Sequence, residues 1–555
     1  MTEPADIVIR NGRLMAFAPV PAEATALAIR GDRIAAVGTE AEIAVLKGPA
    51  TEEIDAAGGT IVPGFIEGHV HLFGGSAELD MLDLSGIRGS EALTAAVRAR
   101  AAAEPDARCV IGVSADYFAL GEGKTITRHD LDDILPERPF VMMAADHHTV
   151  WANTAALEAG GILQGGPAPG GEIVMGEDGL ALGPLFEVGA FGHVWRLTPH
   201  GGRELIGYVT GDDPDPPATP AQRAADKDII ARGLAYAAAQ GITTLHNMDG
   251  NRYQLELLSE LDAEGRLACR VQVPLHLKPH HPLDRLDEAA EWARLWSGDR
   301  VWSGRVKMFM DGVMESYTAF MLHPYPAKPD SRGAALFEES AFNEICVRAD
   351  TLGLQISVHA IGDAAVRRTL DGYRAARAAN GARDHRHRIE HIESLDPADL
   401  PRFGREGVVA SMQPLHSPLG RLFPAPPSDA YLREDQKRLA FAWRDLRDAG
   451  AHLMFSTDWP VAPLPVMRSI QAAVATATLD GPWGDQRQTL DEAVRAYTAD
   501  AAWGEFSEAS KGRLAAGFKA DVAVLTDDIQ VVASERLGEV SALATLCAGR
   551  VTHRG

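Results

Sequence analysis

The middle of the chain alternates short apolar runs with alanine-rich segments of helical character, and this alternation limits the fold more than any other feature. Strands that alternate with helices predict a parallel sheet. The candidate strands are IVPGFIEGHVHL (61–72), ITTLHNM (242–248), RVQVPLHL (270–277), RVKMFMDG (305–312), LQISVHAIGD (354–363), RIEHIESL (388–395), VVASMQPLH (408–416) and LMFSTDWP (453–460). They supply the eight strands that a closed (β/α)₈ TIM barrel needs, so we predict an α/β barrel.

Both ends of the chain have a different texture, made of short β segments broken by turns. DIVIRNGRLM and ALAIRGDRIAAVG contain the NG and GD pairs typical of hairpins. KGRLAAGFKADVAVL and ATLCAGRVTHRG show the same texture near the C-terminus. We therefore expect residues 1–62 and 508–555 to form one small β-sandwich domain, and residues 63–507 to form the barrel.

The spacing between the first two candidate strands is too long for a simple connection. A βαβ unit takes roughly 30 residues or somewhat more, yet about 170 residues separate His71 from the strand at 242. The region from about 75 to 235 is therefore predicted to be a large insertion that begins at the barrel mouth and covers it. It includes GGPAPGGEIVMGEDG and GDDPDPPATP, which have the composition of surface loops.

Bulk composition excludes several classes of protein. The formal net charge of −24 argues against nucleic acid, because a phosphate backbone needs a basic face, and against docking on an anionic membrane. The four cysteines form no CxxC pair, so neither a thiolate zinc site nor a disulfide framework is expected. We see no signal-peptide pattern and no apolar run of about 18 residues, and expect a cytoplasmic protein. The sequence leaves a homodimer open.

The most specific local feature is the pair His69 and His71 at the end of the first candidate strand. On a strand, residues i and i+2 point to the same side. At the carboxyl end of a barrel strand, both imidazoles would reach into the mouth, where barrel enzymes keep their sites. Imidazole is the commonest neutral ligand for Zn²⁺ and similar ions. Taken alone, an HxH pair is weak evidence for a metal.

Three further residues strengthen the metal hypothesis. His359, His391 and Asp458 each lie near the carboxyl end of a separate candidate strand. The gaps are 391 − 359 = 32 and 458 − 391 = 67 residues, which suit one and two βα units. Parallel strands place their carboxyl ends together, so these side chains would converge with the HxH pair. The sequence thus predicts a metal site made of four histidines and one aspartate.

PGFIEGHVH, VKMFMDG, HAIGD, RIEH and STDWPV together resemble the amidohydrolase superfamily, and within it amidohydrolase family 3 and its YtcJ-like branch, which includes the N-substituted formamide deformylases. The resemblance extends over essentially the whole chain, through EEIDAAGGTIVPGF, DHHTVWANTAAL and the closing KGRLAAGFKADVAVL. One departure is Glu67, where the usual motif has Asp. That position is not a ligand, so the metal site is unaffected.

The resemblance also singles out Lys307, which is similar to the carboxylated lysine that bridges two metals in binuclear members. A free ammonium would be repelled by two dications, whereas a lysine carbamate is anionic and offers one oxygen to each ion. The alternative is a lysine whose charged end reaches solvent or pairs with a carboxylate. The expected cofactor is Zn²⁺ or a similar divalent ion, with one or two ions in the site.

The ligand set predicts hydrolysis of a C–N bond in an amide by a metal-activated hydroxide. Aromatic residues in the insertion, Tyr117, Phe118 and Trp151, suit a small and largely apolar substrate. Asp458 would take the proton from the nucleophile and pass it to the leaving nitrogen. A deaminase or an esterase would use the same site, and both remain alternatives. Some amidohydrolase-like chains are non-catalytic assembly proteins, but those typically lack the ligands that this sequence keeps.

Four residues are weaker candidates for the substrate pocket: His148, Trp151 and Glu187 in the insertion, and His416 after the seventh strand. A structural role is an equal alternative for each. Asp363 follows a glycine at a strand-to-helix turn, so we expect it to cap the helix. The remaining histidines considered have no partner pattern and are expected to be satisfied or solvent-facing: His246, His276, His280, His281 and His452.

Overall fold

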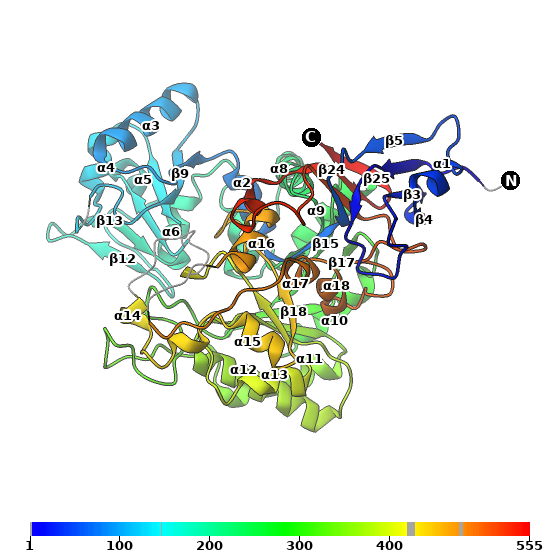
Figure 1. Cartoon of the computed structure of the whole chain (residues 1–555). Helices are drawn as coiled ribbons and strands as arrows, with labels where there is room; N and C mark the ends of the chain where they lie inside the picture. Colours follow the sequence, from blue (N-terminus) through cyan, green and yellow to red (C-terminus); the bar gives the residue numbers. More distant parts are fainter. Residues whose placement is uncertain (1–2, 122, 146, 419–427, 477–480) are drawn as a thin grey trace. The chain divides into compact units, whose positions relative to one another are not determined.

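The computed structural model describes residues 3–121, 123–145, 147–418, 428–476 and 481–555. The chain divides into two compact units (Figure 1). The first contains Met1–His71 and Leu234–Gly555, and the second contains Leu72–Gly233. Strands alternate with helices through the first unit, so the predicted α/β class is confirmed. No helix among the described residues is long and apolar enough to cross a membrane.

Parallel strands make up the centre of the first unit. One sheet has the order β17-β15-β14-β7, and another has the order β16-β18-β19-β20-β21-β22. Each of the eight predicted runs overlaps at least one of these strands, and β17 lies outside all eight. Their bounds are β7 (Phe65–Val70), β14 (Ile242–Asn247), β15 (Arg270–Gln272), β16 (Leu275–His276), β17 (Val301–Trp302), β18 (Arg305–Phe309), β19 (Gln355–Ala360), β20 (Arg388–His391), β21 (Val409–Met412) and β22 (His452–Phe455).

The two parallel sheets are connected at both sides. A parallel bridge between Val70 and Trp459 joins the end of β7 to the segment after β22. On the other side, β15 and β16 follow each other along the chain with only Val273 and Pro274 between them. The carboxyl ends of the strands consequently lie at one edge. The candidate ligands His69, His359 and His391 lie on strands near this edge, and His71 and Asp458 follow β7 and β22.

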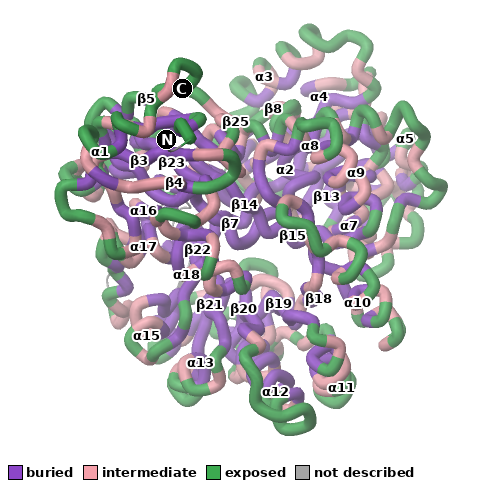
Figure 2. The backbone as a smooth tube through the Cα atoms, turned by 90° about the vertical axis from the view of Figure 1, so that its right-hand side faces the viewer, coloured by how far each residue is buried: buried purple, intermediate pink, exposed green. Residues whose placement is uncertain are grey.

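Helices follow the parallel strands and pack their apolar faces inward. α12 (Asp363–Asn380) buries Val366, Leu370 and Tyr373 at helical spacing and ends at Gly381, whose φ of 90° favours glycine. In Figure 2 the strands β19–β21 are purple along their length, while α11 to α13 carry green outer faces. The bounds of these and neighbouring helices are α9 (Arg252–Ala263), α10 (Arg285–Leu295), α11 (Glu339–Thr351), α13 (Leu400–Glu406), α15 (Trp443–Asp448), α16 (Val466–Val474), α17 (Leu490–Ala496) and α18 (Ala499–Gly504).

The chain ends form two further sheets, of order β4-β3-β1-β5 and β2-β6-β23-β24-β25. The second sheet combines strands from both ends of the chain, and one apolar cluster contains side chains from both sheets, among them Ile9, Leu27, Val522 and Leu546. The bounds are β1 (Ile7–Arg10), β2 (Arg13–Leu14), β3 (Ala26–Arg30), β4 (Arg33–Gly38), β5 (Glu52–Asp55), β6 (Thr60–Pro63), β23 (Val522–Leu525), β24 (Ala542–Cys547) and β25 (Arg550–Arg554).

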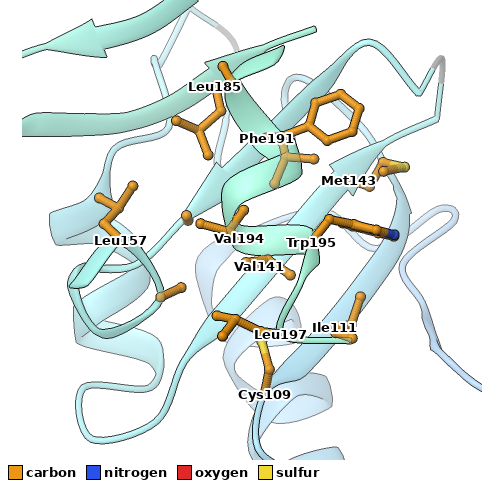
Figure 3. Packing of buried hydrophobic residues seen from close by; sticks show 14 of the residues in the cluster. Cys109, Ile111, Val141, Met143, Leu157, Leu185, Phe191, Val194, Trp195 and Leu197 are labelled. Atoms are coloured by element: carbon orange, nitrogen blue, oxygen red, sulfur yellow. The ribbon is translucent and has the colours of Figure 1, made fainter. Parts of the chain in front are cut away.

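The second unit has its own six-stranded sheet, of order β12-β13-β11-β10-β9-β8, which the sequence pattern did not indicate. Its core packs Phe191, Val194 and Trp195 of one helix with Val141 and Met143 of one strand (Figure 3). The strands are β8 (Leu82–Asp83), β9 (Val110–Ala115), β10 (Phe140–Ala144), β11 (Thr149–Ala152), β12 (Glu172–Met175) and β13 (Ala181–Phe186). The helices are α2 (Leu72–Glu78), α3 (Ser90–Ala103), α4 (Arg128–Ile134), α5 (Thr154–Ala159), α6 (Val188–Trp195) and α7 (Arg203–Val209), and the chain returns to the first unit within α8 (Pro220–Ala238).

Candidate metal centre

His69, His71 and Asp458 meet where β7 ends beside the segment that follows β22. The Nε2 atoms of His69 and His71 lie 3.3 Å and 3.2 Å from the same carboxylate oxygen, Oδ1 of Asp458. Backbone hydrogen bonds hold the two segments together, since Asp458 N–H donates to the His69 carbonyl at 3.0 Å and His71 N–H donates to the Trp459 carbonyl at 2.8 Å. The pairing of the strand ends therefore sets the distances among these three side chains.

His391 and His359 complete the cluster. His391, His69 and Asp458 are buried and offer ligand atoms that all lie within 4.8 Å of one another. The ring of His359 lies 4.4 Å from that of His391, centroid to centroid. His391 and Asp458 have φ values of 77° and 64°, a left-handed conformation that is uncommon outside glycine. Such backbone outliers concentrate at functional sites.

Hydrogen bonds fix the orientation of three imidazoles. Nδ1 of His69 donates to Glu390 at 2.9 Å, and Nδ1 of His71 donates to Asp249 at 2.6 Å. Nδ1 of His391 donates to the amide oxygen of Gln413 at 2.9 Å. A ring nitrogen that donates leaves the other nitrogen as the lone-pair donor for a metal. All three histidines accordingly present Nε2 as the ligand atom.

His359 has the opposite orientation. Its Nε2 donates to the carbonyl of Gly312 at 3.1 Å, so Nδ1 is the nitrogen with a lone pair for a metal. The loop that carries this carbonyl is anchored by Asp311, which accepts from the backbone N–H groups of Ile361 and Gly362 at 3.1 Å and 2.9 Å. Burial raises the pKa of Asp311 to about 7.

Lys307 is fully buried on β18, and its Nζ forms no hydrogen bond within the described part of the chain. Nζ lies 4.6 Å from the centroid of the Phe309 ring. Burial lowers the pKa of Lys307 to about 8, and the charge of Lys307 in turn lowers the pKa values of His69 and His359. Burying an ammonium without a hydrogen-bond partner costs free energy. A bound group or a chemical modification at Lys307 would remove this cost.

The titration behaviour of the histidines suits ligation of a cation. Burial is the first cause that lowers the pKa of His69, to about 4, and it also lowers the pKa values of His359 and His391. These imidazoles are therefore neutral at pH 7, the form that binds metals. Burial lowers the pKa of His71 as well, but Asp249 and Asp458 outweigh it and raise the pKa to about 9. Metal binding at His71 would displace a proton.

The geometry of the donors fits a divalent ion. Oδ1 of Asp458 is buried without a hydrogen-bond partner among the described residues, between imidazole nitrogens at 3.2 Å and 3.3 Å. Ligand atoms bound tetrahedrally to Zn²⁺ at 2.0–2.1 Å are about 3.3 Å apart. Once His71 has lost its proton, two imidazole nitrogens and a carboxylate oxygen at this spacing are suitable ligands for such an ion.

Glu67, the departure from the usual motif, also contributes to the site. Its Oε1 accepts a hydrogen bond from the backbone N–H of Thr457 at 2.9 Å, next to Asp458. Burial raises the pKa of Glu67 to about 8, which favours the neutral acid. Glu67 thus fixes the segment that carries Asp458 without adding a charge.

Glu390, Asp249 and Gln413 are functional candidates that the sequence reasoning missed. Each lies at or just after the carboxyl end of a parallel strand, β20, β14 and β21 respectively. That position was the available signal, and Glu390 directly precedes His391 in the RIEH motif. Such carboxylate or amide partners orient metal-binding histidines and affect metal affinity.

His416 lies beside the cluster, as its place after the seventh strand suggested. Its ring stacks on that of His391 with 6.0 Å between centroids, and its Nε2 is 3.6 Å from Oδ2 of Asp458. Burial lowers the pKa of His416, but Glu393 and Asp458 raise it above the usual value. Its role in substrate binding stays a prediction.

The other three pocket candidates belong to the second unit. His148 Nδ1 donates to Glu187 at 3.0 Å, and Glu187 has a φ of 60° at the start of α6. Trp151 is only 4% exposed and packs in an apolar core cluster with its ring edge against Tyr117. This burial favours the structural alternative for Trp151, because a packed indole has little surface for a ligand. Substrate binding by His148 and Glu187 stays a prediction.

The structure also tests two minor predictions, for Asp363 and His246. Asp363 was expected to cap a helix, but Gly362 occupies the capping position and Asp363 is the first residue of α12. Its carboxylate instead accepts from the backbone of Leu322 at 2.7 Å and the side chain of Gln436 at 2.9 Å. His246, expected to be satisfied, is fully buried with both ring nitrogens hydrogen-bonded.

Comparison with known proteins agrees with these features. The amidohydrolase family model matches residues 52–553. The chain is 27% identical to the YtcJ protein of Bacillus subtilis over 511 residues, 91% of each chain. It is 27% identical to N-substituted formamide deformylase of Arthrobacter pascens over 566 residues, 99% of this chain and 98% of the other.

The fold of this chain also resembles that of a solved structure. An uncharacterized metal-dependent hydrolase from Pyrococcus furiosus superposes with a TM-score of 0.70 at 27% identity, covering 93% of this chain and 98% of that one. The resemblance to amidohydrolase family 3 read from the motifs is confirmed. The chain belongs to the amidohydrolase family.

Proposed function

We propose that this chain, as a metal-dependent hydrolase of the amidohydrolase family, cleaves the C–N bond of an amide in a small and largely apolar molecule. The observation that carries the proposal is the position of Asp458 Oδ1 between the Nε2 atoms of His69 and His71, buried and 3.3 Å and 3.2 Å from them. The deformylase relative acts, by its name, on N-substituted formamides. That substrate class has the bond type and the modest size that the proposal assigns.

One or two Zn²⁺ ions are the proposed cofactor. The ligands would be His69, His71, His359, His391 and Asp458, with Lys307 between two ions if two are bound. A bound divalent ion lowers the pKa of a water molecule from 15.7 to roughly 7 and polarises a carbonyl group.

Lys307 is proposed to carry a carbamate. Its amine reacts with CO₂, forming an N–C bond and releasing one proton, and the product is anionic. This change would replace a buried, unpartnered ammonium by a group with two acceptor oxygens among cations. The buried position of Nζ beside Phe309 would shield the carbamate from water.

Asp458 is proposed to handle the proton. Water adds its oxygen to the amide carbon, and Asp458 accepts the proton that the water loses. The carboxylate then delivers this proton to the nitrogen as the C–N bond breaks, so that an amine and a carboxylic acid are released. The leaving nitrogen needs this proton, because an amide anion is a very poor leaving group. His391 and His416 border the same carboxylate and restrict its movement.

The finer architecture is also proposed. We interpret the two connected parallel sheets as one (β/α)₈ barrel, and the two terminal sheets as one β-sandwich built from both chain ends. The placement of the second unit over the barrel mouth remains a prediction.

A substrate screen tests the proposed reaction. The zinc-loaded protein would be incubated with N-formyl, N-acyl and cyclic amides, and with esters and ring amidines, and the release of amine, alcohol or ammonia measured. Amine release from at least one amide, lost after chelation, supports the proposal. Ammonia release from amidines, or alcohol release from esters, without any amide hydrolysis would contradict it.

A further inference from the structure

Charged and polar side chains are buried on several parallel strands of the first unit, among them β14, β18 and β20. Residues two apart on a strand point to the same side. The interior of a (β/α)₈ barrel is usually filled by branched apolar side chains, yet here the pairs at such spacing are polar and have less than 1% exposure: Thr244 and His246, Arg305 and Lys307, Arg388 and Glu390. A polar interior of this kind must be internally hydrogen-bonded to be stable.

The first link of this interior holds the candidate ligand His69. Glu390 accepts from His69 Nδ1 at 2.9 Å and from the hydroxyl of Ser357 at 2.5 Å. Arg388 donates to both oxygens of Glu390, at 2.9 Å each. The position of the Glu390 carboxylate therefore depends on Arg388, which holds both of its oxygens.

The second link runs from Arg388 to Glu505. Arg388 donates from Nη1 to Nδ1 of His246 at 2.7 Å, so this nitrogen has no proton. Nε2 of His246 then carries the proton and donates to Glu505 at 2.6 Å. Each group in this series of hydrogen bonds, from Arg388 through His246 to Glu505, therefore has a defined role as donor or acceptor.

The third link reaches the segment that follows the last helix of the strand–helix region. Glu505 comes directly after α18 and pairs with the ammonium of Lys511. Lys511 also lies 3.5 Å from the hydroxyl of Thr244 and 5.1 Å from the ring centroid of Trp302. Both Glu505 and Lys511 have side chains at most 5% exposed.

The buried polar groups between His69 and Lys511 form more hydrogen bonds than Arg305, which lies in the same interior. Arg305 is equally buried, yet both of its terminal nitrogens lack hydrogen-bond partners among the described residues. Arg388, by contrast, uses all three guanidinium nitrogens, with further bonds to the Gly68 carbonyl and the Ser411 hydroxyl. The contacts from His69 to Lys511 thus form one connected hydrogen-bond network.

We propose that His246 and Glu505 are positioning residues for the metal centre. They hold the guanidinium of Arg388, which holds Glu390, which fixes the ring of His69 with Nε2 toward Asp458. The segment from 505 to 511 then contributes to metal affinity although it does not touch the metal ligands. This inference rests on the proposed function, because it requires that His69 bind a metal.

Zinc affinity of the full-length protein tests the inference. The dissociation constant for Zn²⁺ would be measured by chelator competition for the wild type, Glu390→Gln and Glu505→Gln. Losing an outer partner of a metal-binding histidine typically weakens metal binding 10–100-fold. We expect a loss in this range for Glu390→Gln and a loss of roughly tenfold, the lower limit, for Glu505→Gln.

Asp521→Asn provides the matched control. Asp521 forms an equally buried pair with Arg270, at 2.8 Å and 3.1 Å, in the same unit. The bonds of this pair lead to Asp299 and to the backbone of Ala548. Asp521→Asn should lower the unfolding temperature of the metal-free protein as Glu505→Gln does, but leave zinc affinity unchanged. If Glu505→Gln and Asp521→Asn lost zinc affinity equally, general destabilisation would explain the loss, and the inference would be overturned.

Two further variants keep the result decisive. If Glu505→Gln does not fold, Ser357→Ala removes a single hydroxyl from Glu390 and should still weaken zinc binding a few-fold; wild-type affinity in that variant would contradict the network. His69→Ala separates the two hypotheses. If it binds zinc as the wild type does, the proposed function fails. If it loses zinc while Glu505→Gln binds normally, only the positioning role fails.

Discussion

The imidazole of His71 and the carboxylate of Asp458 approach to 3.2 Å, although His71 follows β7 and Asp458 follows β22, far apart in the sequence. Their backbones are joined by the bridge between Val70 and Trp459, so neither side chain depends on a long flexible loop. Sites built on rigid elements hold their geometry more closely than sites on loops. The metal centre is therefore expected to be largely preformed in the folded chain.

Removal of the metal should affect both activity and stability. An ion that binds only the native state stabilises it by mass action, so a chelator should lower the unfolding temperature and abolish hydrolysis. Metal analysis and thermal unfolding before and after chelation measure this. Fully active enzyme with less than about a tenth of an equivalent of metal would contradict the ligand assignment of His69, His71 and His391.

Asp458→Asn should separate proton transfer from metal binding. The substitution keeps the shape of the side chain, and the histidines remain as ligands, so most of the metal should be retained. Loss of a general acid–base group typically lowers turnover by about 10²-fold or more. Metal content and kcat, measured on the same preparation, provide the test. Near wild-type turnover in Asp458→Asn would show that Asp458 does not transfer the proton.

Lys307→Ala should lower metal occupancy if the lysine carries a bridging carbamate. Short-chain carboxylates such as formate could then occupy the space and restore part of the activity. Isotope-labelled CO₂ should give a carbamate signal in the wild type that disappears in the variant. An unmodified amine in the metal-loaded wild-type protein would exclude the bridge.

The sequence was most informative where local pattern and position coincide. Strand periodicity located most of the parallel strands of the first unit but not β17 (Val301–Trp302), and the carboxyl ends of the predicted strands identified the residues that the structure brings together. The hydrogen-bond partners of the histidines could not be predicted from the sequence. The partner of His69 Nδ1, for example, is Glu390, more than 300 residues away. The register between strands decides such contacts, and a one-residue shift would turn these side chains to the other face.

The same limit explains Trp151 and Asp363. The sequence suggested a helix cap for Asp363 and left a pocket wall and a structural role as equal alternatives for Trp151. Tertiary contacts give Asp363 another role and favour the structural alternative for Trp151. Trp151 lies on β11 in the six-stranded sheet of the second unit, and its apolar cluster includes residues distant in the sequence, such as Leu84 and Leu93. Asp363 bonds to segments that come from other loops.

Glu492 should give a pH-dependent contribution to stability. Arg444 donates to both oxygens of Glu492, at 3.1 Å and 2.5 Å, and these hydrogen bonds hold the pKa of Glu492 at about 2, below the usual 4.5. A lowered pKa stabilises the fold fully above the usual value, and this stabilisation is lost as the pH falls through about 2. Glu492→Gln should therefore cost about 2 kcal/mol near neutral pH, the scale of a charge-assisted hydrogen bond.

Denaturant unfolding of both proteins checks this pH dependence. The difference between wild type and Glu492→Gln should shrink steadily below about pH 4. A difference that stays constant from neutral to acid pH would mean that the carboxylate charge contributes nothing. Glu539→Gln is a suitable control, because Glu539 pairs with Arg536 at a site that is 63% exposed, where ion pairs contribute little.

Trp151→Ala tests what the second unit contributes to substrate choice. Trp151 is 4% exposed within an apolar cluster, so its truncation should cost about 3–5 kcal/mol of stability, as large-to-small changes of buried aromatic residues do. We expect the ranking of amide substrates by bulk to stay unchanged. Phe118→Ala, at a ring that is 50% exposed, should change stability by less than about 0.5 kcal/mol and serves as the matched surface variant. Unfolding free energies and kcat/KM for a small and a bulky amide measure both effects. If Trp151→Ala changed the ranking while stability was preserved, the indole would belong to the substrate pocket after all.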